Sequence, residues 1–272
     1  MKLLVIGGGG REHALAWKAA QSPLVDRVYV APGNGGTALE PGIENVPIAA
    51  DDIESLVRFA ATESIGLTIV GPEAPLVAGV VDSFEGSGLR CFGPRQAAAQ
   101  LEGSKTFAKA FLSRHRIPTA AYGAFTEIEP ALEYLEQVGA PIVVKADGLA
   151  AGKGVILAQD LGTARAAVRD MLGGGRFGTA GAQVVIEEFL TGEEASFIVM
   201  ADGSHVLALA SSQDHKARDD GDLGPNTGGM GAYSPAPVVT PEVHARVMEQ
   251  VILPTVRGLA DEGTPYTGFL YA

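Results

Sequence analysis

The residues of this sequence that are best suited to chemistry are lysines set among glycines. Lys145 ends an apolar run, and the glycine-rich stretch after it closes with Gly152, Lys153 and Gly154. Glycines allow the backbone to approach phosphate oxygens, and lysines neutralise phosphate charge as compact cations. The motif therefore predicts a nucleoside triphosphate site. It is not a Walker loop, because no Gly-Lys-Ser/Thr follows the four-residue interval, and a hairpin with an incidental lysine is the simpler alternative.

A charged segment that follows an apolar run forms the second motif. After residues 184–186 come Glu187, Glu188, Phe189 and Leu190, and Glu194 lies a few positions further on. A strand that ends in such a hinge can present backbone groups and a carboxylate to adenine, and a further carboxylate to ribose. Glutamates that merely cap the end of a strand are the alternative.

The stretch from residue 213 to 237 is dense in Gly, Asp and Asn and has no periodicity, so we expect a long polar loop with a functional role. Its polar side chains include Asp214, Lys216, Asn226 and Thr227, and Gly228, Gly229 and Met230 follow them. Small residues beside several kinds of polar group are typical of sites for small polar substrates. His215 has no spaced partner and is expected to be structural rather than a metal ligand. No Gly-x-Ser-x-Gly elbow or His-Glu-x-x-His pair supports hydrolysis.

A glycine turn near the start of the chain offers a place for an anion. Residues 7–10 are all glycine, they follow an apolar run, and Arg11, Glu12 and His13 come next. If the turn opens a helix, backbone N–H groups and a positive helix end would face the anion. The turn does not match the dinucleotide-binding fingerprint, because Glu12 stands where the third glycine is required. A tight turn without a ligand is an equally open interpretation.

Two more turns follow apolar runs of the same region. Asn34 lies in the turn at residues 31–37, and Glu73 lies in the turn at residues 71–75. Because parallel strands place their carboxyl ends at one sheet edge, we expect these turns to lie beside the glycine turn. The Glu73 carboxylate is suited to ribose hydroxyls, although an acidic residue at a helix start is the commoner role.

The elements that position these motifs follow an α/β pattern. The apolar runs at 2–6, 28–31, 67–70 and 89–92 alternate with helix-forming segments at 12–20, 53–63 and 75–85. Such a series closes through right-handed crossovers into a Rossmann-like parallel sheet that extends to about residue 103.

The pattern changes after residue 104. We expect helices at 105–115, 163–171 and 241–258, and strands at 141–146, 155–158, 183–189, 195–200, 205–211 and 266–272. The strands at 195–200 and 205–211 flank an Ala-Asp-Gly turn and predict a hairpin. The elements between residues 141 and 189 form a compact α/β insert whose size suits a lid.

Composition narrows the possible functions. The formal charge of −12 disfavours nucleic acid and anionic membranes as partners. The single cysteine, Cys91, excludes an intrachain disulfide and fits a reducing cytoplasm. No signal peptide or membrane span is recognisable.

Six motifs, taken in order, resemble the phosphoribosylamine-glycine ligase family of ATP-grasp ligases along the whole chain. They are residues 9–14, 70–76, 101–105, 145–155, 187–194 and 224–235. The resemblance implies an α/β fold: an N-terminal Rossmann-like parallel-sheet domain, then an ATP-grasp fold with a lid subdomain and an incomplete core. The corresponding bounds are 1–103 for the first domain, 104–122 with 192–272 for the core, and 123–191 for the lid.

The resemblance also implies a reaction. ATP would drive the joining of glycine to 5-phosphoribosylamine through a glycyl phosphate, giving glycinamide ribonucleotide, ADP and phosphate in purine biosynthesis. The cofactors would be ATP with Mg²⁺ or Mn²⁺. The protein would be a cytoplasmic monomer or weak oligomer whose partners are these small substrates, without nucleic acid or membrane.

The family's functional residues fall on positions already singled out. Lys145, Lys153 and Asp214 would be catalytic. Lys105 and Lys145 would hold the ATP phosphates, Gly152, Lys153 and Gly154 would close over them, Glu187, Glu188, Phe189 and Leu190 would meet adenine, and Glu194 would hold ribose. Asp214, Lys216, Asn226, Thr227, Gly228, Gly229 and Met230 would position the substrates, and Gly9, Arg11, Glu12, His13, Asn34 and Glu73 would face phosphoribosylamine.

Two departures from the family pattern affect these expectations. Ala217 stands where the family usually has an arginine, and Arg218 follows it. The family's Glu-x-Asn metal ligands and a nearby arginine would lie beyond residue 272. The resemblance therefore predicts that the 272-residue chain alone has impaired or no catalysis.

Three alternatives remain open at the level of sequence. Another ATP-grasp ligase, such as a carboxylase of purine or biotin chemistry, would share the lysines and the lid but lack the motif at 224–230. A nucleotide-binding module without turnover would bind ATP but show no glycine-dependent reaction. A Rossmann dinucleotide binder would bind nicotinamide cofactors.

Overall fold

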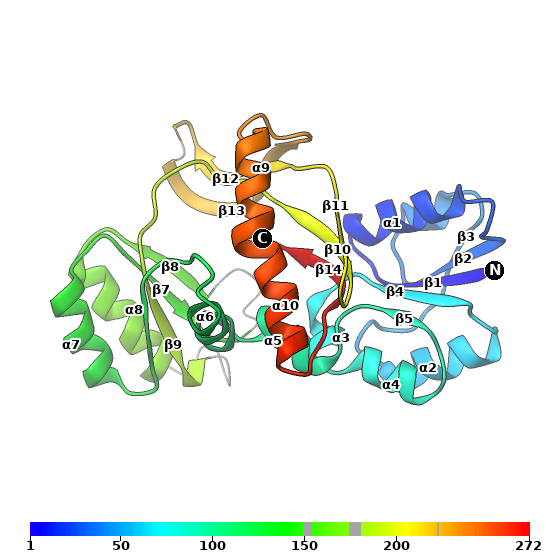
Figure 1. Ribbon diagram of the computed structural model, residues 1–272, viewed down its shortest axis with the longest axis horizontal. Coiled ribbons are helices and arrows are strands. Elements are labelled where there is room, and N and C mark those ends of the chain that lie inside the picture. The colour runs from blue at the N-terminus through cyan, green and yellow to red at the C-terminus, as the bar shows by residue number, and fades with distance from the viewer. Residues whose placement is uncertain (149–153, 174–180, 222) are drawn as a thin grey trace. The chain divides into compact units, whose positions relative to one another are not determined.

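The computed structural model describes residues 1–148, 154–173, 181–221 and 223–272 (Figure 1). The chain divides into two compact units. Unit 1 consists of Met1–Gln100 with Gly263–Gly268, and unit 2 consists of Leu101–Glu262 with Phe269–Ala272. Among the described residues, no helix is both long enough and apolar enough to span a membrane.

Unit 1 is built on a parallel sheet with the strand order β3-β2-β1-β4-β5. The strands are β1 (Lys2–Gly7), β2 (Arg27–Pro32), β3 (Ile43–Asn45), β4 (Leu67–Val70) and β5 (Cys91–Phe92). In register, Ile6 of β1 lies between Ala31 of β2 and Val70 of β4. The turns after these strands therefore share one sheet edge, as the sequence predicts.

The helices of unit 1 cover both faces of this sheet. They are α1 (Gly10–Ala20), α2 (Ile53–Thr62), α3 (Glu73–Val77), α4 (Val80–Gly86) and α5 (Gln96–Gly103), whose end extends into unit 2. Alternate β1 side chains enter two cores, because successive residues of a strand point to opposite faces. Leu4 packs with Phe84 on one face and Val5 packs with Ala16 on the other. Burying each large apolar side chain contributes about 1.5–3 kcal/mol.

The elements of unit 1 that the sequence predicts need four corrections. Strand β3 and helix α5 were not anticipated. The helix expected at 75–85 is two helices, because Gly79 adopts a left-handed conformation with φ of 88° between them. The strand expected at 89–92 is shorter and begins at Cys91.

Unit 2 contains a second sheet, with the strand order β6-β9-β7-β8 and antiparallel pairing. Its strands are β6 (Tyr122–Phe125), β7 (Ile142–Ala146), β8 (Val155–Ala158) and β9 (Val184–Glu188). Helices α7 (Ile128–Val138) and α8 (Leu161–Gly173) pack on it through Leu135, Val168 and Met171. Helix α6 (Lys105–Arg114) precedes this sheet in the chain. The expected strands and the helix at 163–171 are present, whereas β6 and α7 were not anticipated.

A third sheet has the order β11-β10-β14, and all of it except Thr267 and Gly268 of β14 belongs to unit 2. Strands β10 (Ile198–Asp202) and β11 (Val206–Ala208) form the expected hairpin, and β14 (Thr267–Tyr271) is the expected last strand. The helix expected at 241–258 consists of α9 (Pro241–Val247), a π-helical turn (Met248–Ile252) and α10 (Leu253–Asp261).

The prediction of a long loop at residues 213–237 is wrong. Strands β12 (Gln213–Asp219) and β13 (Leu223–Tyr233) form an antiparallel ribbon with register shifts on both sides of Ala217. The two strands form their own two-stranded sheet, and many of their described side chains are exposed. Backbone hydrogen bonds maintain such a ribbon without a buried apolar face, so the alternating pattern that reveals a core strand is missing.

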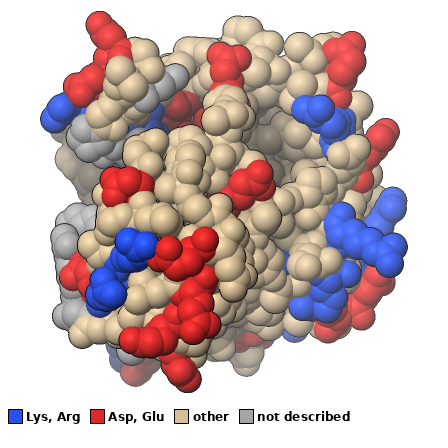
Figure 2. Space-filling view, turned by 90° about the vertical axis from the view of Figure 1, so that its left-hand side faces the viewer, with Lys and Arg blue, Asp and Glu red and all other residues tan. Residues whose placement is uncertain are grey.

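Acidic side chains gather on the side of unit 2 that carries α7 (Figure 2). This helix and the residue before it expose Glu127, Glu129, Glu133 and Glu136. Like charges of this kind repel polyanions, in agreement with the net charge of −12.

Candidate functional site

The end of β7 is tied to the start of α6 by a compact polar network in unit 2. Ser104 caps α6, because its Oγ accepts a hydrogen bond from the Phe107 N–H at 3.0 Å. The Asp147 carboxylate accepts from Ser104 Oγ at 3.0 Å and from the Thr106 N–H at 2.7 Å. Lys105 Nζ donates to the carbonyls of Asp147 at 3.1 Å and Gly148 at 3.0 Å. Lys105 is thereby fixed beside the first residues of the glycine-rich stretch.

Lys145 and Glu187 come together across neighbouring strands. Lys145 lies on β7 and Glu187 on β9, and Lys145 Nζ lies 2.9 Å from Glu187 Oε2. Lys109 of α6 also lies within 3.1 Å of the same oxygen. The sequence predicts roles for Lys105, Lys145 and Glu187, but Lys109 was missed, since a lysine inside a helix carries no local signal of a buried ion pair.

The cluster places the ammonium groups of Lys105 and Lys145 near each other in a partly buried setting. Burial lowers the pKa of Lys105 from 10.5, and the nearby Lys145 ammonium lowers it further, whereas Asp147, Glu102 and Glu187 act in the opposite direction. An anion bound here would stabilise the lysine charges. The arrangement is therefore chemically suited to phosphate oxygens.

Part of the glycine-rich motif lies outside the described residues. Residues 149–153, which include Gly152 and Lys153, belong to that part. Gly154 is described, and its carbonyl accepts a hydrogen bond from the Ala146 N–H at 2.8 Å.

The segment after β9 presents a mixed polar and apolar surface. Glu188 accepts a hydrogen bond from the Ala121 N–H at 3.2 Å, so its carboxylate ties this segment to the start of β6. Leu190 is 64% exposed. An exposed aliphatic group beside strand-end backbone atoms is suited to a planar base.

A small hollow in unit 2 brings together three of the predicted residues. It is lined by Glu194, Ala195, Ser196, Asp214, Lys216 and Tyr271. Lys216 Nζ lies 3.5 Å from the Glu194 carboxylate. The hydroxyls of Ser196 and Tyr271 lie 3.2 Å apart. The sequence analysis did not single out these two residues, because their segments predict strands and contain no motif that indicates a binding site.

The β13 residues of the predicted substrate motif lie against β12. Thr227 Oγ1 donates to the Lys216 carbonyl and accepts from the Gly229 N–H, each at 3.0 Å. A Cβ atom at Gly229 would lie 2.9 Å from Asp214 Oδ1, so the glycine leaves room for this carboxylate. Gly228 and Met230 are exposed, and the side chain of Asn226 lies outside the described part of the structure.

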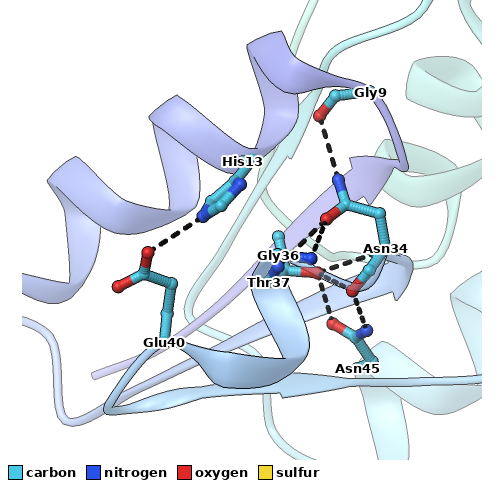
Figure 3. A network of polar contacts seen from close by, with 7 residues as sticks. All are labelled: Gly9, His13, Asn34, Gly36, Thr37, Glu40 and Asn45. Carbon is cyan, nitrogen blue, oxygen red and sulfur yellow. Dashed lines mark hydrogen bonds and ion pairs between the residues drawn. The ribbon is translucent and has the colours of Figure 1, made fainter.

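In unit 1, Asn34 holds the glycine turn and the second turn together (Figure 3). Its Nδ2 donates to the carbonyls of Gly8 at 3.0 Å and Gly9 at 3.4 Å. Its Oδ1 accepts from the N–H groups of Gly36 at 2.7 Å and Thr37 at 3.0 Å. The Asn34 amide is thus a structural link at the sheet edge.

Glu12, which stands where the dinucleotide-binding fingerprint requires its third glycine, packs its side chain against the glycine turn. Its side chain is nearly buried, and its carboxylate accepts from the Gly9 N–H at 2.7 Å and from Arg11 Nε at 2.9 Å. Cβ atoms at Gly7, Gly9 or Gly71 would lie within 3 Å of this side chain. The Glu12 side chain therefore occupies the space that side chains at these three glycine positions would need.

The other predicted residues of this edge are more accessible. Arg11 Nη1 lies 3.0 Å from the Glu73 carboxylate, and both side chains are about half exposed. His13 Nε2 lies 3.1 Å from Glu40 Oε1. Together they offer a guanidinium, a carboxylate and an imidazole to a polar ligand.

The described residues contain a buried cysteine and no cluster of metal-binding side chains. Burial raises the pKa of the Cys91 thiol to about 12, which removes the thiolate that a nucleophile needs. No group of three or more His, Cys, Asp or Glu side chains in the described part of the chain is placed to hold a metal ion.

Comparisons with known families cover the whole chain. The family described as "Phosphoribosylglycinamide synthetase, N domain" matches residues 1–102, and "Phosphoribosylglycinamide synthetase, ATP-grasp (A) domain" matches residues 103–272. A phosphoribosylamine–glycine ligase of Allochromatium vinosum is 79% identical over all 272 residues, and one of Escherichia coli strain K12 is 70% identical. The chain spans 64% and 63% of the lengths of these two relatives.

Solved structures give the same picture at the level of fold. The crystal structure of a phosphoribosylamine–glycine ligase from Thermotoga maritima is 32% identical, with a TM-score of 0.85, and the match covers 100% of this chain and 64% of that one. The biotin carboxylase domain of a Hydrogenobacter thermophilus 2-oxoglutarate carboxylase is 17% identical, with a TM-score of 0.72 and coverage of 99% and 60%. The second likeness is one of fold alone.

Proposed function

Because this chain belongs to the phosphoribosylglycinamide synthetase family, we propose that it serves the ATP-dependent ligation of glycine to 5-phosphoribosylamine in purine biosynthesis. Its fold is α/β, with an N-terminal parallel-sheet domain followed by an ATP-grasp domain. The observation that carries the proposal is the cluster of Lys105, Lys145 and Glu187 at the junction of α6, β7 and β9.

In this proposal the cluster binds the nucleotide. Lys105 and Lys145 bind phosphate oxygens, with Lys153 and the adjoining glycines closing over them. Leu190 offers its exposed side chain to adenine together with the segment from Glu187 to Phe189. Glu194 accepts hydrogen bonds from ribose hydroxyls.

The chemistry explains why lysines are used instead of a nucleophilic triad. A carboxylate is a poor acyl donor because its leaving group would be oxide. Attack of the glycine carboxylate on the terminal phosphorus of ATP forms glycyl phosphate and releases ADP. The amine of phosphoribosylamine then attacks the glycyl carbonyl, and phosphate leaves while the amine loses a proton. The protein contributes positioning and charge neutralisation.

The remaining predicted residues bind the two acceptor substrates. Asp214 and Lys216 offer opposite charges to the ammonium and carboxylate of glycine, and residues 226–230 complete that side. In unit 1, Gly9, Arg11, His13, Asn34 and Glu73 bind phosphoribosylamine. Glu12 contributes indirectly, since its carboxylate holds Arg11 and the turn.

Mg²⁺ or Mn²⁺ would neutralise ATP charge in a reaction of this class. No group of three or more His, Cys, Asp or Glu side chains among the described residues is placed to hold such an ion, and one or two carboxylates beside the ATP phosphates would be enough for it.

The test is release of ADP in the presence of ATP, Mg²⁺ and glycine, with and without freshly made phosphoribosylamine, by the 272-residue chain and by a chain extended to the length of its relatives. We expect ADP from the extended chain, and only when both substrates are present, and we expect nicotinamide cofactors not to bind. ATP binding without any substrate-dependent ADP release, also from a chain extended to the length of its relatives, would replace the ligase with a nucleotide-binding module. Equal turnover with other carboxylates would indicate a different ATP-grasp ligase.

A further inference from the structure

The Glu187 carboxylate lies between two lysines that differ in their surroundings. Its side chain is 8% exposed, and its Oε2 lies 3.1 Å from Lys109 Nζ and 2.9 Å from Lys145 Nζ. Two ammonium groups thus share one buried oxygen. One carboxylate balances only one of the two positive charges.

Lys109 is held by the protein on several sides. Its Nζ donates to Thr119 Oγ1 at 2.7 Å and to the Ala120 carbonyl at 3.3 Å, and it lies 5.7 Å from the centre of the Tyr122 ring. Its side chain is 9% exposed. These contacts satisfy the donors of the ammonium inside the protein, so Lys109 is a fixed cation.

Lys145 is held less completely. Its side chain is 27% exposed, and Glu187 is its polar partner among the residues that the structure describes. It also lies close enough to Lys105 to lower the pKa of that lysine. Lys145 can therefore leave the carboxylate for an incoming anion at a smaller cost than Lys109 can.

We propose that Lys109 is a positioning residue that acts as the permanent counter-ion of Glu187 and thereby frees Lys145 to bind the nucleotide phosphates. The inference rests on the proposed nucleotide site. When Lys145 moves to phosphate, Glu187 is not left as an unpaired buried charge, which would be costly. Without Lys109, Glu187 holds Lys145 in the empty site and competes with phosphate for it.

The first test compares ATP with adenosine. The variant K109M keeps the length of the side chain and removes its charge. We expect the Kd for ATP to rise about tenfold and the Kd for adenosine, which has no phosphates, to stay within about twofold. K109R restores the cation and should recover most of the ATP affinity. A purely structural role would weaken both ligands equally.

The second test is a double-mutant cycle with E187Q, which removes the negative charge. In the E187Q background K109M should cost about twofold or less in ATP affinity, since there is no carboxylate left to capture Lys145. If K109M lowered the ATP affinity equally with Glu187 and with E187Q, the proposal would be overturned, and Lys109 would simply attract the phosphates at long range. R114M removes a cation from the same helix away from Glu187 and should leave the Kd for ATP unchanged.

A third measurement needs no nucleotide. The rate at which an amine-reactive acylating reagent modifies Lys145, followed by peptide mass spectrometry, should fall several-fold in K109M and rise in E187Q. An unchanged rate in K109M would overturn the role of Lys109 even if the protein bound no ATP. Absence of ATP binding by the unsubstituted protein, with the expected change in Lys145 labelling, would instead contradict the proposed function alone.

Discussion

At the residue scale, the electrostatic position of Lys105 has a consequence for pH dependence. Its ammonium is surrounded by backbone carbonyls, is partly buried and lies near Lys145, and the pKa of Lys105 is lowered from 10.5 mainly by burial. Only the protonated form attracts phosphate. The pH range in which Lys105 loses its charge therefore begins below that of an ordinary lysine.

We predict that ATP affinity falls as the pH is raised toward 10, by up to about tenfold per pH unit above the pKa of Lys105. K105R should remove much of this loss, because arginine keeps its charge throughout that range. Calorimetric titration of both proteins at several pH values would measure it. Parallel pH profiles for the two proteins would show that Lys105 does not face the nucleotide.

Glu12 provides a prediction about stability. Its side chain is 4% exposed, and its carboxylate accepts hydrogen bonds from the Gly9 N–H and the Arg11 guanidinium. E12A leaves both donors without this acceptor and creates a void, so we expect a loss of about 2–4 kcal/mol in the free energy of unfolding. Urea unfolding measures the change. E54A, which removes an exposed acid of α2, is the control and should be nearly neutral; a similarly small effect for E12A would contradict this role.

The sequence predicted individual residues where their chemistry is visible locally, as at Lys145 and Glu187, and the family resemblance added Lys105. The structure brings these three residues into one cluster. Lys109 and Tyr271 were missed because their neighbours come from distant segments, and contacts between distant segments leave no mark on a single stretch of sequence.

At the element scale, the ribbon of β12 and β13 departs most from expectation. Apart from the short strands β3 and β6, which were missed, the strands of the larger sheets were predicted to within a few residues, because alternating or continuous apolar side chains reveal them. The ribbon has no such face, and its glycines suggested a loop. Gly229 shows why the ribbon needs glycine. Its φ is 128°, which side chains rarely allow, and the Asp214 carboxylate occupies the place that a Cβ atom would need.

Substitution G229A should impair the reaction more than the fold. An alanine must adopt a strained conformation and displace the Asp214 carboxylate, so we expect the KM for glycine to rise about tenfold with a change of only a few degrees in Tm. G231A is the matched control, because nothing lies within 4 Å of its new methyl group. Steady-state kinetics, with each substitution placed in a chain extended to the length of its relatives, would measure both KM values; equal values would remove Asp214 from the glycine site.

Helices α6 and α10 are joined by a charged contact that depends on pH. Glu262, next to α10, accepts from Arg114 at 2.8 Å and 3.0 Å and lies 2.7 Å from His115 Nε2. Hydrogen bonds from Arg114 and His115 lower the pKa of Glu262 to about 2. This ion pair joins two segments of unit 2 that are distant in sequence.

A carboxylate with a lowered pKa stabilises the folded state above its unfolded pKa, here 4.5, and this contribution is lost as the pH falls toward 2. We therefore expect E262Q to lower Tm by about 2–4 °C at pH 7, with a smaller difference from the unsubstituted protein as the pH falls below 4. Calorimetric scans of both proteins from pH 7 to below pH 4 would measure this difference in Tm. A difference that is constant with pH would mean that the charge of Glu262 does not stabilise the contact.

At the scale of the whole molecule, the sequence predicted the class of fold and the family. Alternating apolar runs and helices gave the parallel sheet of unit 1, whose edge carries the turns with Arg11, Asn34 and Glu73. The order of the motifs identified the ATP-grasp region that the family comparison covers. No local pattern in the sequence predicts how one unit is positioned relative to the other.

The central claim is that ATP binds in unit 2, at the cluster of lysines, and not at the glycine turn of unit 1. Hydrogen–deuterium exchange with and without ATP tests this claim most directly, because both regions are read in one experiment. We predict slower exchange at residues 105–109, 145–148 and 187–190 and no change at residues 7–13. Protection at residues 7–13 without protection in the three segments of unit 2 would contradict the account.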